Sequence, residues 1–231
     1  MNKVVLCWSG GKDSALALQY LLEDNSIEVV GLLTTVNQEF NRVSMHGVRR
    51  ELIEQQARQI GLPLYCVEVN EATNEHYEAK MAEQHLELKK MGVTHIAFGD
   101  IFLEDLKAYR EEKCAKIGLK CLFPLWKKDT HQLLLEFWDR SFETIICCTN
   151  SQMGSERVGV IYTPEVLNNL PQGVDPCGEN GEFHTFLTKA PYFTKSLMIK
   201  VGEKITKEYT WTDDSGNEQK SIFYFADIAS I

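Results

Sequence analysis

The first half of the chain alternates short apolar runs with longer amphipathic segments, and no other feature limits the possible folds as strongly. The runs have the length of strands, and between them apolar residues recur at helical spacing. The predicted strands cover residues 3–8, 27–35, 64–69, 93–98 and 120–123, and the predicted helices cover residues 13–22, 46–60, 75–91 and 103–117. Such alternation is typical of a parallel sheet between two helical layers. We therefore expect an open, twisted, Rossmann-like α/β sheet with helices on both faces over residues 1–124.

Beyond residue 124 the alternation loosens. A helix over residues 130–140 and a strand over residues 144–149 are followed by a region rich in Gly and Asn. The tail has extended segments at residues 197–201, 207–212 and 221–226, with a predicted hairpin turn at residues 213–216. We expect a smaller α+β subdomain over residues 125–231 that recognises the substrate.

The charge balance restricts the partners of the chain. Its 231 residues carry a formal net charge of -9, with a pI of about 5.2. Nonspecific nucleic-acid binding depends on Lys and Arg that neutralise phosphates, so we do not expect a nucleic-acid partner. No apolar stretch approaches the roughly 20 residues that span a bilayer, so we expect no membrane partner either.

Cysteine usage and the N-terminus favour the cytoplasm. The chain runs from Met1 directly into a strand-like segment, which leaves no room for a signal peptide. An odd number of cysteines, with no Cys-x-x-Cys pair, is typical of reduced and buried thiols. The seven are Cys7, Cys66, Cys114, Cys121, Cys147, Cys148 and Cys177.

A six-residue loop between the first predicted strand and helix has the composition of a phosphate site. It consists of Ser9, Gly10, Gly11, Lys12, Asp13 and Ser14, and we call it the phosphate loop. Its glycines allow backbone amides to approach an anion, and the following helix offers unpaired N–H groups and a partial positive charge. Lys12 adds a mobile charge, and the two serine hydroxyls can donate to phosphate oxygens. The spacing differs from that of a Walker loop. The alternative is a glycine turn that leads into a helix with a solvated lysine.

Other candidates lie at the carboxyl ends of the next strands, where ligands collect in parallel sheets. Thr34 and Thr35 end the second predicted strand and are candidates for contacts with the nucleotide, as is Gly99 at the end of the fourth. His46 could contact phosphate or ribose, or simply lie on the surface of its helix. Asp100 could serve the site or only cap a helix.

The phosphate loop resembles the signature of the PP-loop ATPases, or N-type ATP pyrophosphatases, which cleave ATP between its α- and β-phosphates. Two further blocks narrow the resemblance. The first contains Gly99, Asp100, Ile101, Glu104, Asp105, Tyr109, Arg110, Glu111, Glu112, Leu119, Pro124, Leu125 and Trp126, and the second is Gly178-Glu179-Asn180-Gly181-Glu182-Phe183-His184-Thr185-Phe186. Together they are similar to the diphthine–ammonia ligase family, and the resemblance extends to about Phe193.

The resemblance implies an ATP-dependent, amide-forming ligase. Members of that family use ATP and ammonium to amidate diphthine, a modified histidine of elongation factor 2, and they release AMP and pyrophosphate. The expected acceptor is therefore that side chain or a related carboxylate, which could be a small molecule. Mg²⁺ is expected beside ATP. The chain has no glutaminase domain, so free ammonium is the expected nitrogen source.

The resemblance also implies roles for individual residues. The expected catalytic residues are Lys12, Asp100, Glu179 and Glu182, and the expected metal ligands are Asp13 and Asp100. The expected substrate-binding residues are Asp105, Tyr109, Arg110, Trp126, Glu182, Phe183 and His184. The aromatic rings of Trp126 and Phe183 could attract the quaternary ammonium of diphthine by cation–π contact.

Structural alternatives stand beside several of these roles. Asp105 and Arg110 could belong to a surface helix with ion pairs, residues 178–181 could form an ordinary turn, and His184 could be structural. The second block also departs from the eukaryotic and archaeal pattern, which is closer to Gly-Glu-Gly-Gly-Glu-Tyr-Glu-Thr. Asn180, Phe183 and His184 replace three of its positions, which is similar to bacterial-type relatives.

Two other functions compete with the ligase hypothesis. A PP-loop enzyme that thiolates tRNA is disfavoured by the acidic charge and the missing Cys-x-x-Cys pair. A nucleotide-binding module without turnover would keep the phosphate loop alone. The predicted exposed strands near the C-terminus suggest a homodimer.

Overall fold

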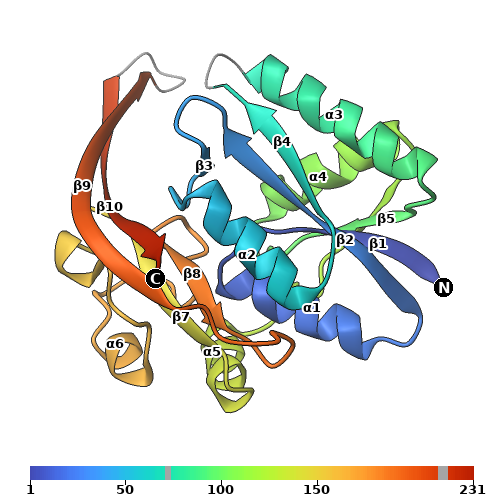
Figure 1. Cartoon of the computed structure of the whole chain (residues 1–231). Coiled ribbons are helices and arrows are strands. Elements are labelled where there is room, and N and C mark those ends of the chain that lie inside the picture. Colours follow the sequence, from blue (N-terminus) through green and yellow to red (C-terminus); the bar gives the residue numbers. More distant parts are fainter. Residues whose placement is uncertain (71–73, 213–217) are drawn as a thin grey trace.

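The chain folds around two β-sheets that lie side by side (Figure 1). The structure is a computed structural model that describes residues 1–70, 74–212 and 218–231. The first sheet contains five parallel strands in the order β4-β2-β1-β5-β6, and the short β3 pairs antiparallel with the end of β2. Their bounds are β1 Asn2–Cys7, β2 Ile27–Asn37, β3 Arg42–Val43, β4 Leu64–Val69, β5 His95–Ala97 and β6 Lys120–Leu122.

Helices cover both faces of this sheet, as the alternation in the sequence predicted. They are α1 Lys12–Glu23, α2 Arg50–Ile60, α3 Asn74–Lys90 and α4 Glu104–Lys116. Alternate residues of β1 point to opposite faces, so Val4 and Leu6 pack with α1 and α2, whereas Val5 packs with α3 and α4. Figure 1 shows these two helical layers on either side of the strands.

The second sheet is antiparallel, with the strand order β8-β7-β10-β9. Its strands are β7 Glu143–Asn150, β8 Phe183–Lys189, β9 Ile199–Thr212 and β10 Glu218–Ser230. Helices α5 Thr130–Asp139 and α6 Pro164–Asn168 and the 3₁₀ turn Ser155–Arg157 complete this part. Strands β9 and β10 pair along a long hairpin, and its predicted turn at residues 213–216 lies outside the described residues.

One continuous core joins the two sheets. Leu6 and Leu18 from the first part cluster with Phe137, Ile146 and Phe186 from the second. Backbone contact adds to this packing, because Leu187 N donates to Gly10 O at 2.8 Å. The two predicted units, residues 1–124 and 125–231, therefore share one hydrophobic core. The boundary between residues 124 and 125 stays a prediction.

The sequence-based helix over residues 46–60 begins too early. Gly47 has φ +67°, outside the helical region, and Arg42 forms an antiparallel bridge with Arg49. The helix consequently starts at Arg50, and residues 44–49 form a loop instead. His46 thereby lies on a loop that reaches the end of the first sheet.

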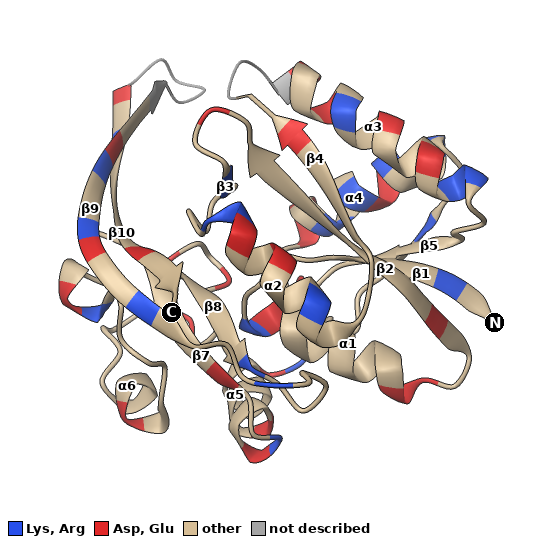
Figure 2. Cartoon of the chain, viewed as in Figure 1, with Lys and Arg blue, Asp and Glu red and all other residues tan. Residues whose placement is uncertain are grey.

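Charged side chains of both signs are mixed along α2, α3 and β9 (Figure 2). Among the described residues, no helix combines the length and the apolar character needed to cross a membrane.

Candidate active site

A cavity of about 1170 Å³ opens at the carboxyl ends of the first sheet. Its floor is formed by the phosphate loop, the end of β2 and the Gly99-Asp100 turn. Residues 44–47, 177–179, 181 and 183–185 form further walls, and side chains of the β9–β10 hairpin close the far side. The cavity therefore lies where the topology of a parallel sheet predicts a ligand, and both halves of the chain line it.

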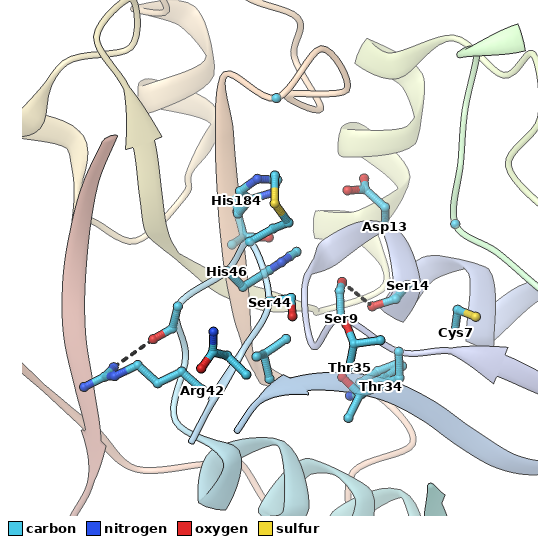
Figure 3. Close-up of a pocket in the computed structure, with 18 of the residues that line it drawn as sticks. Cys7, Ser9, Asp13, Ser14, Thr34, Thr35, Arg42, Ser44, His46 and His184 are labelled. Carbon is cyan, nitrogen blue, oxygen red and sulfur yellow. Dashed lines mark hydrogen bonds between the residues drawn. The ribbon is translucent and has the colours of Figure 1, made fainter. Parts of the chain in front are cut away.

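The phosphate loop is held open by its glycines. Gly10 has φ +79°, and a Cβ there would lie 2.4 Å from Ile53 Cδ1, so this position requires glycine. Gly11 is the N-cap of α1 and provides no side-chain cap, which leaves the first turn of that helix able to receive an anion. The hydroxyl oxygens of Ser9 and Ser14 lie 3.3 Å apart beside it (Figure 3).

Lys12 joins the loop to the second half of the chain. Its side chain is only 3% exposed, and its ammonium donates to Asp13 Oδ2 at 2.9 Å and to the carbonyl of Cys177. Its backbone amide donates to Thr185 Oγ1 at 3.0 Å. Burial alone would lower the pKa of Lys12, but Asp13, together with Cys177 and Glu179, outweighs it and raises that pKa above its ordinary value. A charged ammonium is thus fixed beside the loop.

Acidic groups gather on another side of the loop. Asp100 is 9% exposed and pairs with Arg110, whose Nε lies 2.7 Å from Asp100 Oδ2. Burial raises the pKa of Asp100 despite the opposing charge of Arg110. The alternative of Asp100 as a cap of the next helix is wrong, because Leu103 is the N-cap of α4.

Glu179 approaches the same turn from the second half of the chain. Its Oε1 accepts from Ile101 N at 2.7 Å, next to Asp100. Burial raises the pKa of Glu179 to about 7, and the charges of Asp13 and Asp100 act in the same direction. This carboxyl group can therefore exchange a proton near neutral pH.

Two histidines stand against the phosphate loop on the side away from Cys7 (Figure 3). The ring centroids of His46 and His184 are 4.5 Å apart, with 33° between the ring planes. Burial lowers the pKa of His46 well below its ordinary value, and the positive charges of His184 and Lys12 act in the same direction. Burial and Lys12 lower the pKa of His184 to about 4. Both rings are neutral at physiological pH.

Comparison with known proteins identifies the family. The Diphthamide synthase N-terminal domain model matches residues 2–121, and the Diphthamide synthase C-terminal domain model matches residues 129–220. The chain belongs to the diphthamide synthase family. The two matches together span most of the chain and include the phosphate loop and residues 177–185.

Curated relatives agree with this assignment. The chain is 26% identical to the diphthine–ammonia ligase of Danio rerio, over 88% of each chain, and 24% identical to that of Homo sapiens, over 88% of this chain and 85% of the relative. It is 25% identical to the Schizosaccharomyces pombe enzyme but spans only 36% of its length. These similarities confirm the expected ligase class of enzyme.

A solved structure is also similar in part. The U34-tRNA thiolase NcsA from Methanococcus maripaludis matches 59% of this chain and 55% of its own, at 20% identity and a TM-score of 0.36.

Three predicted substrate-binding residues of this diphthamide synthase family member do not line the cavity. In α4, Leu106 and Arg110 line it, so Asp105 and Tyr109, one position earlier, point about 100° away. Asp105 is exposed and the Tyr109 hydroxyl donates to Glu78. Trp126 packs against Phe123 instead, with Lys107 and Lys127 over its ring.

Glu182 is also outside the cavity lining. Its side chain is 3% exposed, and its Oε1 accepts from Asp175 N at 2.9 Å and from Asn180 Nδ2 at 3.1 Å. The contacts favour a role in shaping the turn at residues 175–182. By contrast, Thr34, Thr35, Gly99, Arg110, Phe183 and His184 all line the cavity.

Gly99 packs directly against the backbone of the phosphate loop. A Cβ at this position would lie 3.0 Å from the Asp13 carbonyl carbon and 3.1 Å from Ser14 N. Only a glycine lets the end of β5 approach the first turn of α1 this closely.

Phe183 contributes to the lining, but Lys12 Nζ already lies 5.1 Å from its ring centroid, which disfavours a second cation on that face.

Sequence reasoning missed two supporting residues. Gln56 is fully buried and donates to Gly10 O at 3.1 Å and to Leu187 O at 2.7 Å, while accepting from Trp8 Nε1 at 2.9 Å. A glutamine on the apolar face of its helix, between Ile53 and Ala57, was the available signal.

Asp175 is the second. Its Oδ2 accepts from Cys177 N at 2.8 Å and Glu179 N at 3.1 Å, and its Oδ1 accepts from Thr130 Oγ1 at 2.9 Å. An aspartate that begins a turn before Pro176 and Gly178 is typical of an Asx turn, which was the signal. It holds the segment that presents the Cys177 carbonyl to Lys12.

Proposed function

We propose that this chain is an ATP-dependent, amide-forming ligase that adenylates a carboxylate and then transfers ammonia to it. One observation carries the proposal: the open N-terminus of α1 lies beside a buried Lys12 ammonium, and a proton-exchanging Glu179 from the other half of the chain stands nearby. Family membership supports it, because the relatives are named diphthine–ammonia ligase.

The residues around the loop fit ATP. Gly10 and the first turn of α1 after Lys12 offer amides to phosphate oxygens, and Ser9 and Ser14 offer hydroxyl groups, whereas Gly11 N already donates to Ser9 Oγ and Lys12 N to Thr185 Oγ1. Thr34 and Thr35 line the cavity at the end of β2 with Gly99 opposite, so we assign them to the nucleoside side. His46 is then assigned to the phosphates.

The acidic groups fit Mg²⁺. This ion is usually held by one or two carboxylates together with substrate phosphates and water, so a larger protein cluster is not required. Asp13 and Asp100 both line the cavity; Asp100 Oδ2 is ion-paired with Arg110 Nε at 2.7 Å but accepts no well-aligned hydrogen bond among the described residues. We assign Asp13 and Asp100 to the ion, which would supply positive charge to the phosphates of ATP.

The proposed reaction has two steps. An oxygen of the acceptor carboxylate attacks the α-phosphorus, and the bond to pyrophosphate breaks. Ammonia then attacks the acyl carbon, the bond to AMP breaks, and a proton leaves the nitrogen. Lys12 and the α1 amides neutralise the charge that develops on the phosphates, and Glu179 accepts the proton.

The acceptor side of the cavity faces the hairpin. Phe40, Phe223 and Phe225 line this side, and Lys207 Nζ lies 4.6 Å from the Phe40 ring centroid. We propose diphthine of elongation factor 2, or a related carboxylate, as the acceptor, in keeping with the names of the relatives. We also propose a cytoplasmic protein, consistent with seven free cysteines. A homodimer is proposed, and light scattering after size exclusion tests it.

The deciding experiment measures AMP release from ATP and ammonium with elongation factor 2 bearing diphthine and with a panel of carboxylates. We expect acceptor-dependent AMP and pyrophosphate in equal amounts. Lys12→Ala should reduce the rate at least about 100-fold, the scale of losing one preorganised charge-stabilising group. The exposed Lys128→Ala is the matched control. ATP binding without AMP release for any acceptor would support a nucleotide-binding module instead.

A further inference from the structure

His46 and His184 belong to distant segments that meet at the phosphate loop. His46 lies on the loop between β3 and α2, and His184 lies on β8, yet their rings are in contact. We propose that this pair forms an anion subsite that holds the pyrophosphate group and takes up a proton when it binds. The proposal rests on the proposed function, in which pyrophosphate is a product.

The position of the pair fits a phosphate ligand. A Cβ on Gly11 would lie 3.2 Å from His46 Nε2, so this ring nitrogen is directly beside the backbone that receives the anion. His184 precedes Thr185, whose hydroxyl accepts from the Lys12 amide. The histidines therefore extend the phosphate loop towards the hairpin (Figure 3).

One ring nitrogen has no partner. His184 Nε2 is buried and forms no hydrogen bond within the part of the chain that the structure describes. Buried polar atoms in proteins are nearly always paired, and each exception calls for an explanation. A phosphate oxygen in the cavity would supply the missing partner.

The charges around the pair favour an anion. The charge of Lys12 acts on both rings, and the N-terminus of α1 adds partial positive charge. The charge of Glu182 acts on His184 in the opposite direction, and Glu182 Oε1 accepts from Asp175 N and Asn180 Nδ2. His46 N donates to Ser44 O, which fixes the backbone of its loop.

Proton uptake follows from these surroundings. The free site keeps both imidazoles neutral, because burial and Lys12 disfavour a further positive charge. Pyrophosphate brings several negative charges against the rings, reverses the local potential and raises their pKa. A proton then binds together with the anion, and the protonated ring becomes a charge-assisted donor.

Calorimetric titration tests the proposal directly. Sodium pyrophosphate without added metal is titrated near pH 6.5 in two buffers of different ionisation enthalpy, which gives the protons taken up per anion. We expect wild-type protein to take up about one more proton than the variant His46→Asn/His184→Asn, by linkage. The variant should bind about tenfold more weakly or worse, as expected for loss of a charge-assisted hydrogen bond. Both proteins are titrated with the same anion at the same pH, so protons that pyrophosphate itself gains or loses cancel in the difference between wild type and the variant.

The control is His131→Asn, an exposed histidine on α5, which should behave as wild type. Equal affinity and equal uptake in the double variant and wild type would overturn the proposal, as would no binding of pyrophosphate to wild type. If the double variant does not fold, His46→Asn, in a loop, is titrated instead with the same criteria. Turnover is not required, so His-dependent pyrophosphate binding without AMP release in any assay would retain this subsite while rejecting the ligase function.

Discussion

At the scale of single residues, the site depends on groups that are held out of water. Negative groups led by Asp13 raise the pKa of Lys12 against its burial, whereas burial raises the pKa of Glu179 to about 7 despite the hydrogen bond from Ile101 N. The two side chains differ in their surroundings, since Lys12 is buried and Glu179 is half-buried. We propose that Lys12 supplies a permanent charge and that Glu179 supplies a proton acceptor.

Glu179→Gln tests this difference through its pH dependence. Wild-type kcat should fall as the pH decreases through about 7, because the carboxylate must be deprotonated to accept a proton. The variant should lose this limb and about 100-fold in kcat at pH 8, the scale of general-base catalysis. The pKa of Glu179 is higher in the folded protein than in the unfolded chain, so ionisation of this half-buried side chain lowers the free energy of unfolding as the pH rises towards 7. The variant should therefore unfold at a higher temperature than wild type at pH 8. An unchanged pH profile would remove Glu179 from the chemistry.

Gln56→Leu tests the support beneath the phosphate loop. The change removes the partner of Trp8 Nε1 and the Gln56 bond to Leu187 O, while Gly10 O keeps the bond from Leu187 N. We expect a loss of about 3 kcal/mol in unfolding free energy, since each orphaned buried group costs about 1–3 kcal/mol, and weaker ATP binding. Urea unfolding and nucleotide titration measure both. The half-buried neighbour Gln55→Leu is the control, and a loss of equal size there would point to a general effect on α2.

At the scale of elements, the turn at residues 175–182 connects the two halves of the site. Asp175 fixes the turn by three hydrogen bonds, and the turn then presents the Cys177 carbonyl to Lys12 and the Glu179 carboxylate to Ile101 N. The phosphate loop is thus shaped by an element that follows it by more than 160 residues.

Asp175→Asn should weaken this connection. The amide replaces an acceptor oxygen with a donor, so at least one hydrogen bond is lost, at about 1 kcal/mol. We expect KM for ATP to rise about fivefold with a smaller change in kcat, measured as AMP release. Asp129→Asn is a matched control, because Asp129 caps α5 and asparagine caps equally well. A normal KM together with normal stability would contradict the assigned role.

Local pattern predicted the first sheet, and it placed the loop at residues 9–14 correctly at the junction of β1 and α1. The alternation of strands and helices gave the two helical layers, and strand ends located Thr34, Thr35 and Gly99 in the cavity. It could not resolve the phase of α4, which decides that Leu106 and not Asp105 faces the cavity. Nor could spacing reveal that Lys12 N meets Thr185 or that Gln56 supports Gly10, because such contacts depend on how distant segments pack.

At the scale of the whole molecule, the hairpin is tied to the first sheet by one ionic cluster. Asp227 on β10 accepts from Arg42 Nη2 at 2.7 Å and from Arg49 Nε and Nη2 at 3.0 and 2.7 Å. Nearby, Phe225 packs against Gly47, where a Cβ would lie 2.6 Å from its ring. These contacts set the distance between the hairpin and the phosphate loop, and so the width of the cavity.

Asp227→Asn should loosen this attachment. Hydrogen bonds from Arg49 lower the pKa of Asp227 to about 2, with Arg42 acting in the same direction. The stabilisation is therefore present above the unfolded pKa of about 3.9 and is lost as the pH falls through about 2. Because the groups are partly exposed, we expect a loss of only about 1 kcal/mol at pH 7, smaller in high salt. Urea unfolding at pH 7 and pH 3 measures it, and an equal difference at both would exclude the ionic cluster.

The bond between Lys12 and Thr185 also has a consequence for biosynthesis. The loop leaves the ribosome before its partner, which is 173 residues further along the chain. At about 5–20 residues per second, roughly 10–35 s pass between their synthesis. A nascent chain therefore displays the phosphate-loop sequence long before it can hold a nucleotide, and prematurely terminated chains that lack β8 should not consume ATP.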